Sequence, residues 1–171
     1  DTPIGSNGVM YLPYLMGERT PHLDPYARGA FIGLGGANTR NDMIRVTMEG
    51  VSFSLKDCLE IFEEVGVEPS KTVLCGGGAK SLLWRNMLTD VFNTETCTSS
   101  STESCALGAA ILAGVASGVY KTVKEGCVKS VFENDVLSPN FERTAEYNKY
   151  YSIYKKVYLA LKEINIELVN L

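Results

Sequence analysis

The sequence contains one histidine, His22, and no CxxC pair of cysteines. A multi-histidine metal site within this chain is therefore excluded, and no metal-ligating residue is predicted. The five cysteines are odd in number and widely spaced, which favours a reducing, cytoplasmic compartment over a disulfide framework. No run of about 18 apolar residues exists, and the first residues lack a signal-peptide pattern, so no membrane segment is expected.

A strong excess of charge of either sign is also missing. The 171 residues carry 16 basic and 20 acidic side chains, a net charge of −4, without any block of Lys and Arg. Such a chain is a poor binder of nucleic acid and of anionic membranes. With 45% hydrophobic residues it can bury a core without disulfides. Because it begins with Asp1 rather than Met, we interpret it as a piece of a longer protein.

The spacing of apolar residues predicts a single α/β domain in which strands and helices alternate. Strands are expected at 9–15, 30–34, 71–75 and 95–98, with a structured loop at 17–29. Helices are expected from a Thr39–Asp42 capping box to a C-cap at Gly66, and at 81–93, 104–118 and 142–169, with a short turn or helix from Thr122 to Ser130.

Two of these helices have a distinctive composition. Small residues fill 104–118, so this helix is expected to pack closely against a sheet or another helix and to be buried. The helix at 142–169 carries a stripe of tyrosine and aliphatic side chains at helical spacing, which we interpret as packing against the core. The stripe consists of Tyr147, Tyr150, Tyr151, Tyr154, Val157, Tyr158, Leu161, Ile164 and Leu168.

The segment VLCGGGAKS (73–81) combines a strand, a triple-glycine turn and a helix start. Glycine has no Cβ, so a ligand can approach the backbone closely, and the N–H groups of a first helical turn attract phosphate. A ligand-free turn is an equally open interpretation. A P-loop is excluded because Ser81 and Leu82 stand where its Gly and Lys are required. A Rossmann GxGxxG pattern is weak, since Ser81 takes its last position.

Four blocks, in order, resemble the C-terminal domain of the FGGY carbohydrate kinase family. They are YLPYLMGERTPHLDPYARGAFIGL (11–34), DMIRVTME (42–49), CGGGAKS (75–81) and TESCALGAAILAG (102–114). The GERTP form is most similar to the xylulokinases of that family. One departure is Val46, where the family usually has Ala or Ser. The resemblance covers nearly the whole chain.

The resemblance implies an actin-like ATPase (ribonuclease H-like) fold, with a mixed sheet flanked by helices. Residues 1–171 would be the C-terminal, nucleotide-binding half of a two-domain kinase, whose N-terminal sugar-binding domain is absent from this chain. ATP would bind between the domains, and the sugar, the catalytic base and most Mg²⁺ ligands would belong to the other domain. We therefore expect no catalytic residue here and no activity from the chain alone.

The implied reaction converts D-xylulose and ATP to D-xylulose 5-phosphate and ADP. Glycerol, gluconate or ribulose kinases are alternatives, as is a non-catalytic nucleotide-binding or dimerisation module, and a homodimer is left open. The residues that would bind the nucleotide are Gly76, Gly77, Gly78, Ala79 and Ser81. Lys80 flanks them and is expected to be a solvated surface lysine. Leu82 replaces an asparagine that glycerol kinases use.

Other polar residues have local interpretations beside functional ones. Glu18 and Arg19 either line the rim of the cleft or form a local ion pair, and both readings stay open. His22 is expected to be polar surface rather than a general base. Asp24 is expected to form a turn, and Asp42 to cap its helix.

Two cysteines are expected to lie near the proposed nucleotide site. Cys75 and Cys105 are expected to be small buried hydrophobic residues rather than nucleophiles, since no histidine stands beside them to activate the thiol. Glu103 precedes the small-residue helix, where the helix dipole alone favours an acidic side chain.

Overall fold

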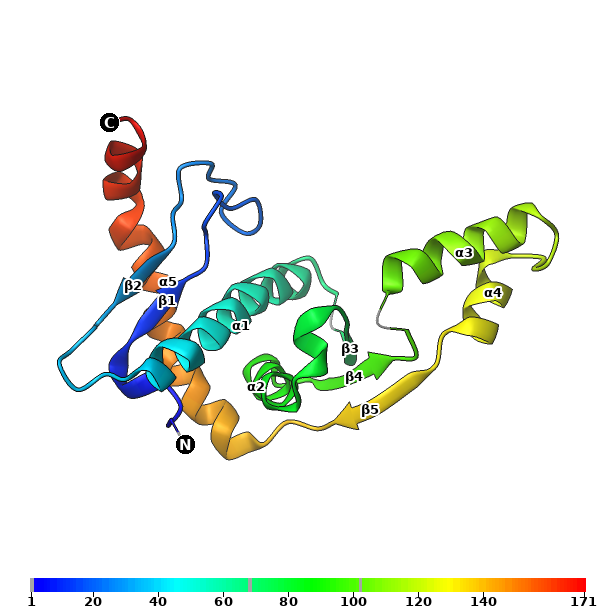
Figure 1. Ribbon diagram of the computed structural model, residues 1–171, viewed down its shortest axis with the longest axis horizontal. Helices are drawn as coiled ribbons and strands as arrows, with labels where there is room; N and C mark the ends of the chain where they lie inside the picture. Colours follow the sequence, from blue (N-terminus) through cyan, green and yellow to red (C-terminus); the bar gives the residue numbers. More distant parts are fainter. Residues whose placement is uncertain (1, 68, 102) are drawn as a thin grey trace. The chain divides into compact units, whose positions relative to one another are not determined.

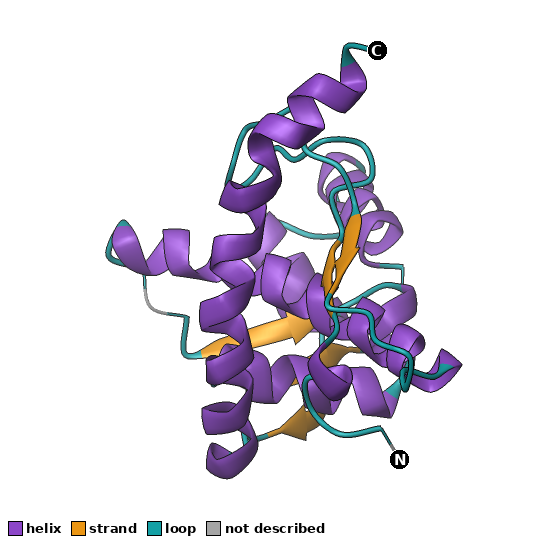
Figure 2. Ribbon diagram, turned by 90° about the vertical axis from the view of Figure 1, so that its left-hand side faces the viewer, coloured by secondary structure: helices purple, strands orange, loops and turns teal. Residues whose placement is uncertain are grey.

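The computed structural model describes residues 2–67, 69–101 and 103–171. These residues form two compact units. The first comprises 2–67, 90–93 and 140–171, and the second comprises 69–89, 94–101 and 103–139. Helices dominate both units and the strands are short (Figure 2). The assignment of 1–171 to one kinase domain stays a prediction.

The first unit combines a two-stranded ribbon with two long helices (Figure 1). Strand β1 (Met10–Leu12) pairs antiparallel with β2 (Ala30–Ile32). Helices α1 (Arg40–Glu64) and α5 (Phe141–Val169) both pack against β1. A short 3-10 helix, η1 (Ser6–Gly8), precedes the ribbon and contacts α1.

Both strands of the ribbon are shorter than predicted. β1 ends before Pro13, because proline has no N–H to donate to the partner strand. β2 ends before Gly33, whose φ of 82° is left-handed. A Cβ at Gly33 would lie 2.4 Å from the carbonyl oxygen of Gly8, so only glycine fits at this close approach.

The predicted start and end of α1 are confirmed. Thr39 Oγ1 accepts a hydrogen bond from the Asp42 N–H, while Asp42 Oδ2 accepts one from the Thr39 N–H at 2.6 Å. This reciprocal pairing satisfies N–H groups that have no partner within the helix. Gly66 follows the helix with a φ of 80°, the left-handed conformation that terminates many helices.

The tyrosine stripe of α5 forms the core of the first unit over its N-terminal half. Phe53 of α1 lies 5.4 to 6.3 Å, between ring centroids, from Tyr147, Tyr151 and Tyr154. Each of the four buried tyrosine hydroxyls of α5 has a polar partner, which offsets the cost of burying a hydroxyl group. Those partners are Arg45 for Tyr147, Asp57 for Tyr151, Tyr14 for Tyr154 and Asp24 for Tyr158. Further along, Ile164 and Leu168 are exposed, so the predicted core contact stops there.

The second unit is built on a mixed three-stranded sheet in the order β3–β4–β5. β3 (Lys71–Leu74) is parallel to β4 (Glu95–Ser99), and β5 (Glu133–Leu137) is antiparallel to β4. The sequence did not predict β5, because the polar residues ENDVL lack a strand pattern and are mostly exposed. Helix α2 (Leu82–Phe92) connects β3 to β4, and its last residues belong to the first unit.

Helix α3 (Ser104–Ala116) is mostly exposed, so the prediction that it is buried is wrong. It packs on α4 (Val123–Ser130), and Ile111 is its buried residue. Small residues do allow a close approach here: a Cβ at Gly114 would lie 2.7 Å from the Tyr120 ring, and one at Gly126 2.7 Å from Ile111. α4 covers only one face of α3, whereas a buried helix needs neighbours on all sides.

Candidate functional site

The triple-glycine turn follows β3 and presents bare backbone. Gly76 has φ 80° and ψ −168°, a conformation that is essentially restricted to glycine. A Cβ added at Gly76 or Gly77 would meet nothing within 4 Å, so the backbone there faces open space. Gly78 differs, because a Cβ there would lie 3.0 Å from the Trp84 ring. Two glycines thus leave room for a ligand, and the third makes room for Trp84.

The turn does not run directly into a long helix, as the sequence suggested. A 3-10 helix, η2 (Gly77–Lys80), comes first, and α2 starts at Leu82. Ser81 Oγ accepts a hydrogen bond from the Trp84 N–H at 3.3 Å and so caps α2. The Ser81 hydroxyl therefore helps to set where α2 begins.

A hollow of about 320 Å³ opens beside the turn at the carboxyl ends of β3 and β4. Leu74 pairs with Thr98 in the parallel register, so the residues that follow the two strands lie at the same sheet edge. This edge is where open α/β sheets bind ligands. The hollow is lined by Leu74, Cys75, Gly76, Ala79, Lys80, Arg85, Thr98, Ser99, Ser101 and Asp135.

The predicted nucleotide residues divide into two groups. Gly76 and Ala79 line the hollow, together with Lys80, which is exposed as expected. Gly77, Gly78 and Ser81 lie next to these residues in the chain but do not line it. Leu82 is exposed on the first turn of α2. A nucleotide contact at any of these residues stays a prediction.

Positive charge and hydroxyl groups dominate the polar lining of the hollow. The Arg85 side chain is 12% exposed, and its Nη1 donates to Asp135 Oδ2 at 3.0 Å. Its Nε is buried and has no hydrogen-bond partner among the described residues. Hydroxyls of Thr98, Ser99 and Ser101 and the ammonium of Lys80 complete the lining. Such a set of donors suits phosphate and ribose oxygens.

Sequence reasoning missed Arg85, Asp135 and the three hydroxyl residues. Thr98, Ser99 and Ser101 could have been found from the parallel pairing of two consecutive strands, which places both carboxyl ends together. No local signal indicates Asp135, because its strand was not predicted. Arg85 lies one helical turn beyond Ser81, on the face of α2 that lines the hollow.

The expectation that Cys75 and Cys105 are buried is wrong, since both are exposed. Cys75 follows β3 at the sheet edge and lines the hollow, and Cys105 lies on the uncovered part of α3. Cys97, inside the central strand β4, is the buried cysteine, and desolvation raises the pKa of its thiol. The position of Cys75 and Cys97 relative to the sheet, not residue type, decides their exposure.

The GERTP loop of the first unit is held by backbone hydrogen bonds. Glu18 Oε1 accepts from the N–H groups of Arg19 and Thr20 at 2.7 and 2.9 Å. Within the described chain Glu18 forms no ion pair with Arg19, so that interpretation is wrong. Asp24 accepts from the Tyr26 N–H and from the Tyr158 hydroxyl, which confirms its turn role.

His22 packs against an aromatic ring instead of lying in solvent. Its imidazole stacks on Tyr158, with 3.6 Å between ring centroids and 7° between planes. Partial burial lowers the pKa of His22 by desolvation. The expectation that His22 is polar surface is therefore wrong, because its ring packs the loop onto α5.

Glu103 takes the N-cap position of α3 without a side-chain cap hydrogen bond.

The described residues contain neither a metal-binding cluster nor a helix that could cross a membrane. Across residues 2–67, 69–101 and 103–171, no three or more His, Cys, Asp or Glu side chains are grouped so that they could hold a metal ion. Among the same residues, no helix combines the length and the apolar character that crossing a membrane requires.

Comparison with known proteins defines the class. The model of the C-terminal domain of the FGGY family of carbohydrate kinases matches residues 2–117, and the chain belongs to this family. It is 39% identical over 166 residues to a xylulose kinase of Bacillus subtilis (strain 168), which covers 97% of the chain and 33% of that protein. The chain therefore spans about a third of the length of the curated relatives that it matches.

Solved structures show the same fold. A ligand-bound xylulose kinase from Lactobacillus acidophilus superposes with a TM-score of 0.82 at 31% identity, covering 94% of the chain and 33% of that structure. A gluconate kinase from Lactobacillus acidophilus gives a TM-score of 0.80 at 31% identity, with 94% and 32% covered. The predicted fold class, the actin-like α/β fold of FGGY kinases, is confirmed.

Proposed function

We propose that the chain is the nucleotide-binding part of an ATP-dependent sugar kinase that phosphorylates D-xylulose. The observation that carries this proposal is the hollow at the glycine turn, where bare backbone, two cationic side chains and three hydroxyl-bearing residues face the same space. Family membership supports the kinase class, and the similarity to xylulose kinases supports the substrate.

The lining residues fit a nucleoside triphosphate. Gly76 lines the hollow and Gly77 follows it in the turn, and both let oxygen atoms of a ligand approach the peptide plane, because no Cβ stands in the way. Lys80 and Arg85 supply positive charge for phosphate oxygens. Bound ATP would supply the γ-phosphoryl group. These residues would bind and orient it.

The other parts of a kinase site are proposed to lie outside this chain. Phosphoryl transfer needs Mg²⁺ on the phosphates and a carboxylate that accepts the proton of the sugar hydroxyl. Among the described residues, no three or more His, Cys, Asp or Glu side chains are grouped so that they could hold Mg²⁺. We propose that the sugar, the base and the Mg²⁺ ligands are held mainly by the remainder of a protein of the relatives' length. The chain alone would then be inactive.

Replacing Gly77 by aspartate is expected to weaken ATP binding about tenfold or more, because it places a carboxylate beside the phosphate oxygens. The change leaves the turn intact, since a Cβ there meets nothing within 4 Å. An NMR titration of ATP into the 171-residue chain measures both the affinity, expected on the order of 1 mM for half a cleft, and the residues involved.

The Gly77→Ala variant is the matched control, because it adds the Cβ without the charge. Unchanged ATP binding by Gly77→Ala and weakened binding by Gly77→Asp support the proposal. Equal binding by the Asp variant and the unmodified chain contradicts it. Chemical-shift changes that occur away from the glycine turn and from the residues after β4 also contradict it.

One alternative substrate rests on a specific observation. The gluconate kinase structure matches the chain as well as the xylulose kinase does in sequence identity, so gluconate is the second candidate substrate. A non-catalytic nucleotide-binding module would bind ATP tightly without further domains. Micromolar affinity in the titration above would favour that module, and a homodimer stays a prediction.

A further inference from the structure

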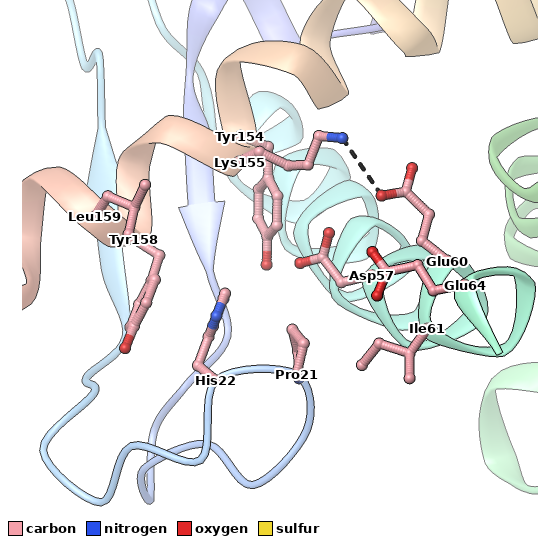
Figure 3. A pocket seen from close by; sticks show the side chains of 10 residues that line it. All are labelled: Pro21, His22, Asp57, Glu60, Ile61, Glu64, Tyr154, Lys155, Tyr158 and Leu159. Carbon is pink, nitrogen blue, oxygen red and sulfur yellow. Dashed lines mark hydrogen bonds and ion pairs between the residues drawn. The ribbon is translucent and has the colours of Figure 1, made fainter.

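A second hollow, of about 440 Å³, lies in the first unit and has no part in the proposed nucleotide site (Figure 3). Its volume falls within the roughly 300–1,000 Å³ of small-molecule sites. Side chains reach it from the GERTP loop, from α1 and from α5. They are Pro21, His22, Asp57, Glu60, Ile61, Glu64, Tyr154, Lys155, Tyr158 and Leu159.

Asp57 is the buried polar group of this hollow. The residue is 7% exposed, and one carboxylate oxygen accepts a hydrogen bond from the Tyr151 hydroxyl at 2.5 Å. Desolvation raises the pKa of Asp57 to about 6, so the group is charged at neutral pH despite its burial. The charge of such a buried carboxylate is stabilised by a cationic partner.

Two further carboxylates face the hollow from the same helix. Glu60 and Glu64 follow Asp57 at a spacing that places all three on one side of α1, as Figure 3 shows. Lys155 of α5 forms an ion pair with Glu60 at 3.3 Å. Glu64 forms no ion pair with any described residue. The ammonium groups of Lys155 and of Lys56 on α1 both lie over the Tyr151 ring, beside these carboxylates. The three carboxylates outnumber the two cations, so the hollow has an excess of negative charge.

The remaining lining is apolar or aromatic. Tyr154, Tyr158 and Leu159 extend from α5, and Ile61 and Pro21 lie across from them (Figure 3). The His22 ring rests on Tyr158 and closes one end. Rings and aliphatic groups next to carboxylates suit a ligand that has an apolar body and a positive charge. The acidic groups are not arranged for a metal ion, because no metal-holding group of side chains is present in the described part of the chain.

We propose that this hollow binds a small organic cation, a primary ammonium group on a compact apolar body, with the ammonium at Asp57 and Glu64. The inference does not depend on the proposed nucleotide function, because the two hollows share no residue. The carboxylates hold the charge, and the tyrosine and aliphatic side chains cover the body.

Three probes that share one apolar body test the proposal on the 171-residue chain at pH 7.5. They are benzylammonium, the neutral benzyl alcohol and the anionic benzoate. Benzylammonium is expected to bind with a Kd on the order of 1 mM, about tenfold more tightly than benzyl alcohol, with benzoate weaker still. An NMR titration should place its shifts at the residues of α1, α5 and the GERTP loop that line the hollow.

The Glu64→Gln variant removes one charge on the solvent side of the hollow and is expected to weaken benzylammonium binding about three- to fivefold. Its matched control is Glu63→Gln, which removes the same charge from the neighbouring exposed position that does not line the hollow. Asp57→Asn is expected to weaken binding about tenfold. If that variant does not fold, the Glu64 and Glu63 pair still decides the question.

Lowering the pH from 7.5 to 5 is expected to weaken benzylammonium binding, because Asp57 takes up a proton near pH 6 and loses its charge. Burial lowers the pKa of His22 by desolvation, and a protonated His22 would add positive charge and so oppose binding as well. The titratable and charged groups near Asp57 are Lys56 and Glu60 on α1, Tyr151, Tyr154 and Lys155 on α5, Tyr14 after β1, and Glu18 and His22 in the loop.

Selective binding of benzylammonium that falls in Glu64→Gln and persists in Glu63→Gln confirms the site. Equal binding of the alcohol and the ammonium overturns it, as does equal loss in the two glutamine variants. Absence of binding at concentrations about tenfold above the expected Kd also overturns it.

Discussion

Replacing Gly50 by alanine is expected to destabilise the first unit by about 3 kcal/mol or more, through overpacking against a rigid neighbour. Gly50 lies inside α1, and a Cβ there would stand 2.2 Å from the Tyr11 carbonyl oxygen of β1. Both atoms belong to backbone, so neither can turn aside as a flexible side chain would. The helix must move away from the ribbon, which opens the core around Val9, Tyr11 and Val46.

The matched control for Gly50→Ala is Gly108→Ala in α3. A Cβ at Gly108 meets nothing within 4 Å, and alanine is favoured over glycine inside a helix by about 1 kcal/mol. The two substitutions should therefore change the free energy of unfolding with opposite signs. Urea unfolding followed by circular dichroism at 222 nm measures both, and fluorescence of Trp84 reports separately on the second unit. A Gly50→Ala protein as stable as the unmodified chain would refute the close packing of α1 on β1.

Replacing Glu49 by alanine is expected to cost about 3–5 kcal/mol, as is typical when one partner of a buried ion pair is removed. Glu49 is 1% exposed, and its carboxylate accepts from the Gly5 N–H, the Ser6 hydroxyl and Arg45 Nε at 2.8 to 3.0 Å. Arg45 also donates to Tyr147 of α5. Loss of the carboxylate leaves the Arg45 charge partly buried without its partner and releases the N-terminal segment.

Glu60→Ala provides the comparison for Glu49→Ala, because it removes a glutamate of the same helix from an exposed pair with Lys155. An exposed ion pair contributes less than about 1 kcal/mol, so this variant should unfold at nearly the same urea concentration as the unmodified chain. If the two variants lose equal stability, the buried network around Glu49 does not hold the first unit together.

Helix ends could be predicted because their signals are local. Thr39 and Asp42 lie three residues apart, and their reciprocal hydrogen bonds follow from that spacing alone. Gly66 ends α1 for an equally local reason, its left-handed conformation. Thr122 Oγ1 likewise accepts from the Glu125 N–H at the start of α4, as predicted. Sequence and structure agree wherever a few neighbouring residues determine the geometry.

Features that depend on distant partners could not be predicted in the same way. β5 is a strand because it pairs with β4, although its residues Asn134 and Asp135 do not favour strands. The exposure of α3 depends on how many elements cover it, which its small residues do not reveal. Cys97 lies inside β4 and Cys75 directly follows the adjacent strand β3, and their exposure is opposite for the same reason.

The sequence predicts some residues of the candidate nucleotide site and misses others. Gly76 and Ala79 were found because glycine at a strand-to-helix turn has a direct physical meaning. Arg85 and Thr98 were not, because they come together with the turn only through the packing of α2 and the parallel pairing of β3 with β4. The second hollow was missed entirely, since it needs α1, α5 and the loop around His22 together.

The central claim, that this chain is the nucleotide-binding part of a sugar kinase, is tested most directly by a chimera. The matching third of the Bacillus subtilis xylulose kinase is replaced by the chain, and ATP turnover is measured with D-xylulose, gluconate, glycerol and ribulose. We predict turnover stimulated by D-xylulose and lowered by Gly77→Asp. A chimera that folds, as shown by its circular dichroism and elution volume, yet gives no turnover with any of the four sugars would contradict the claim.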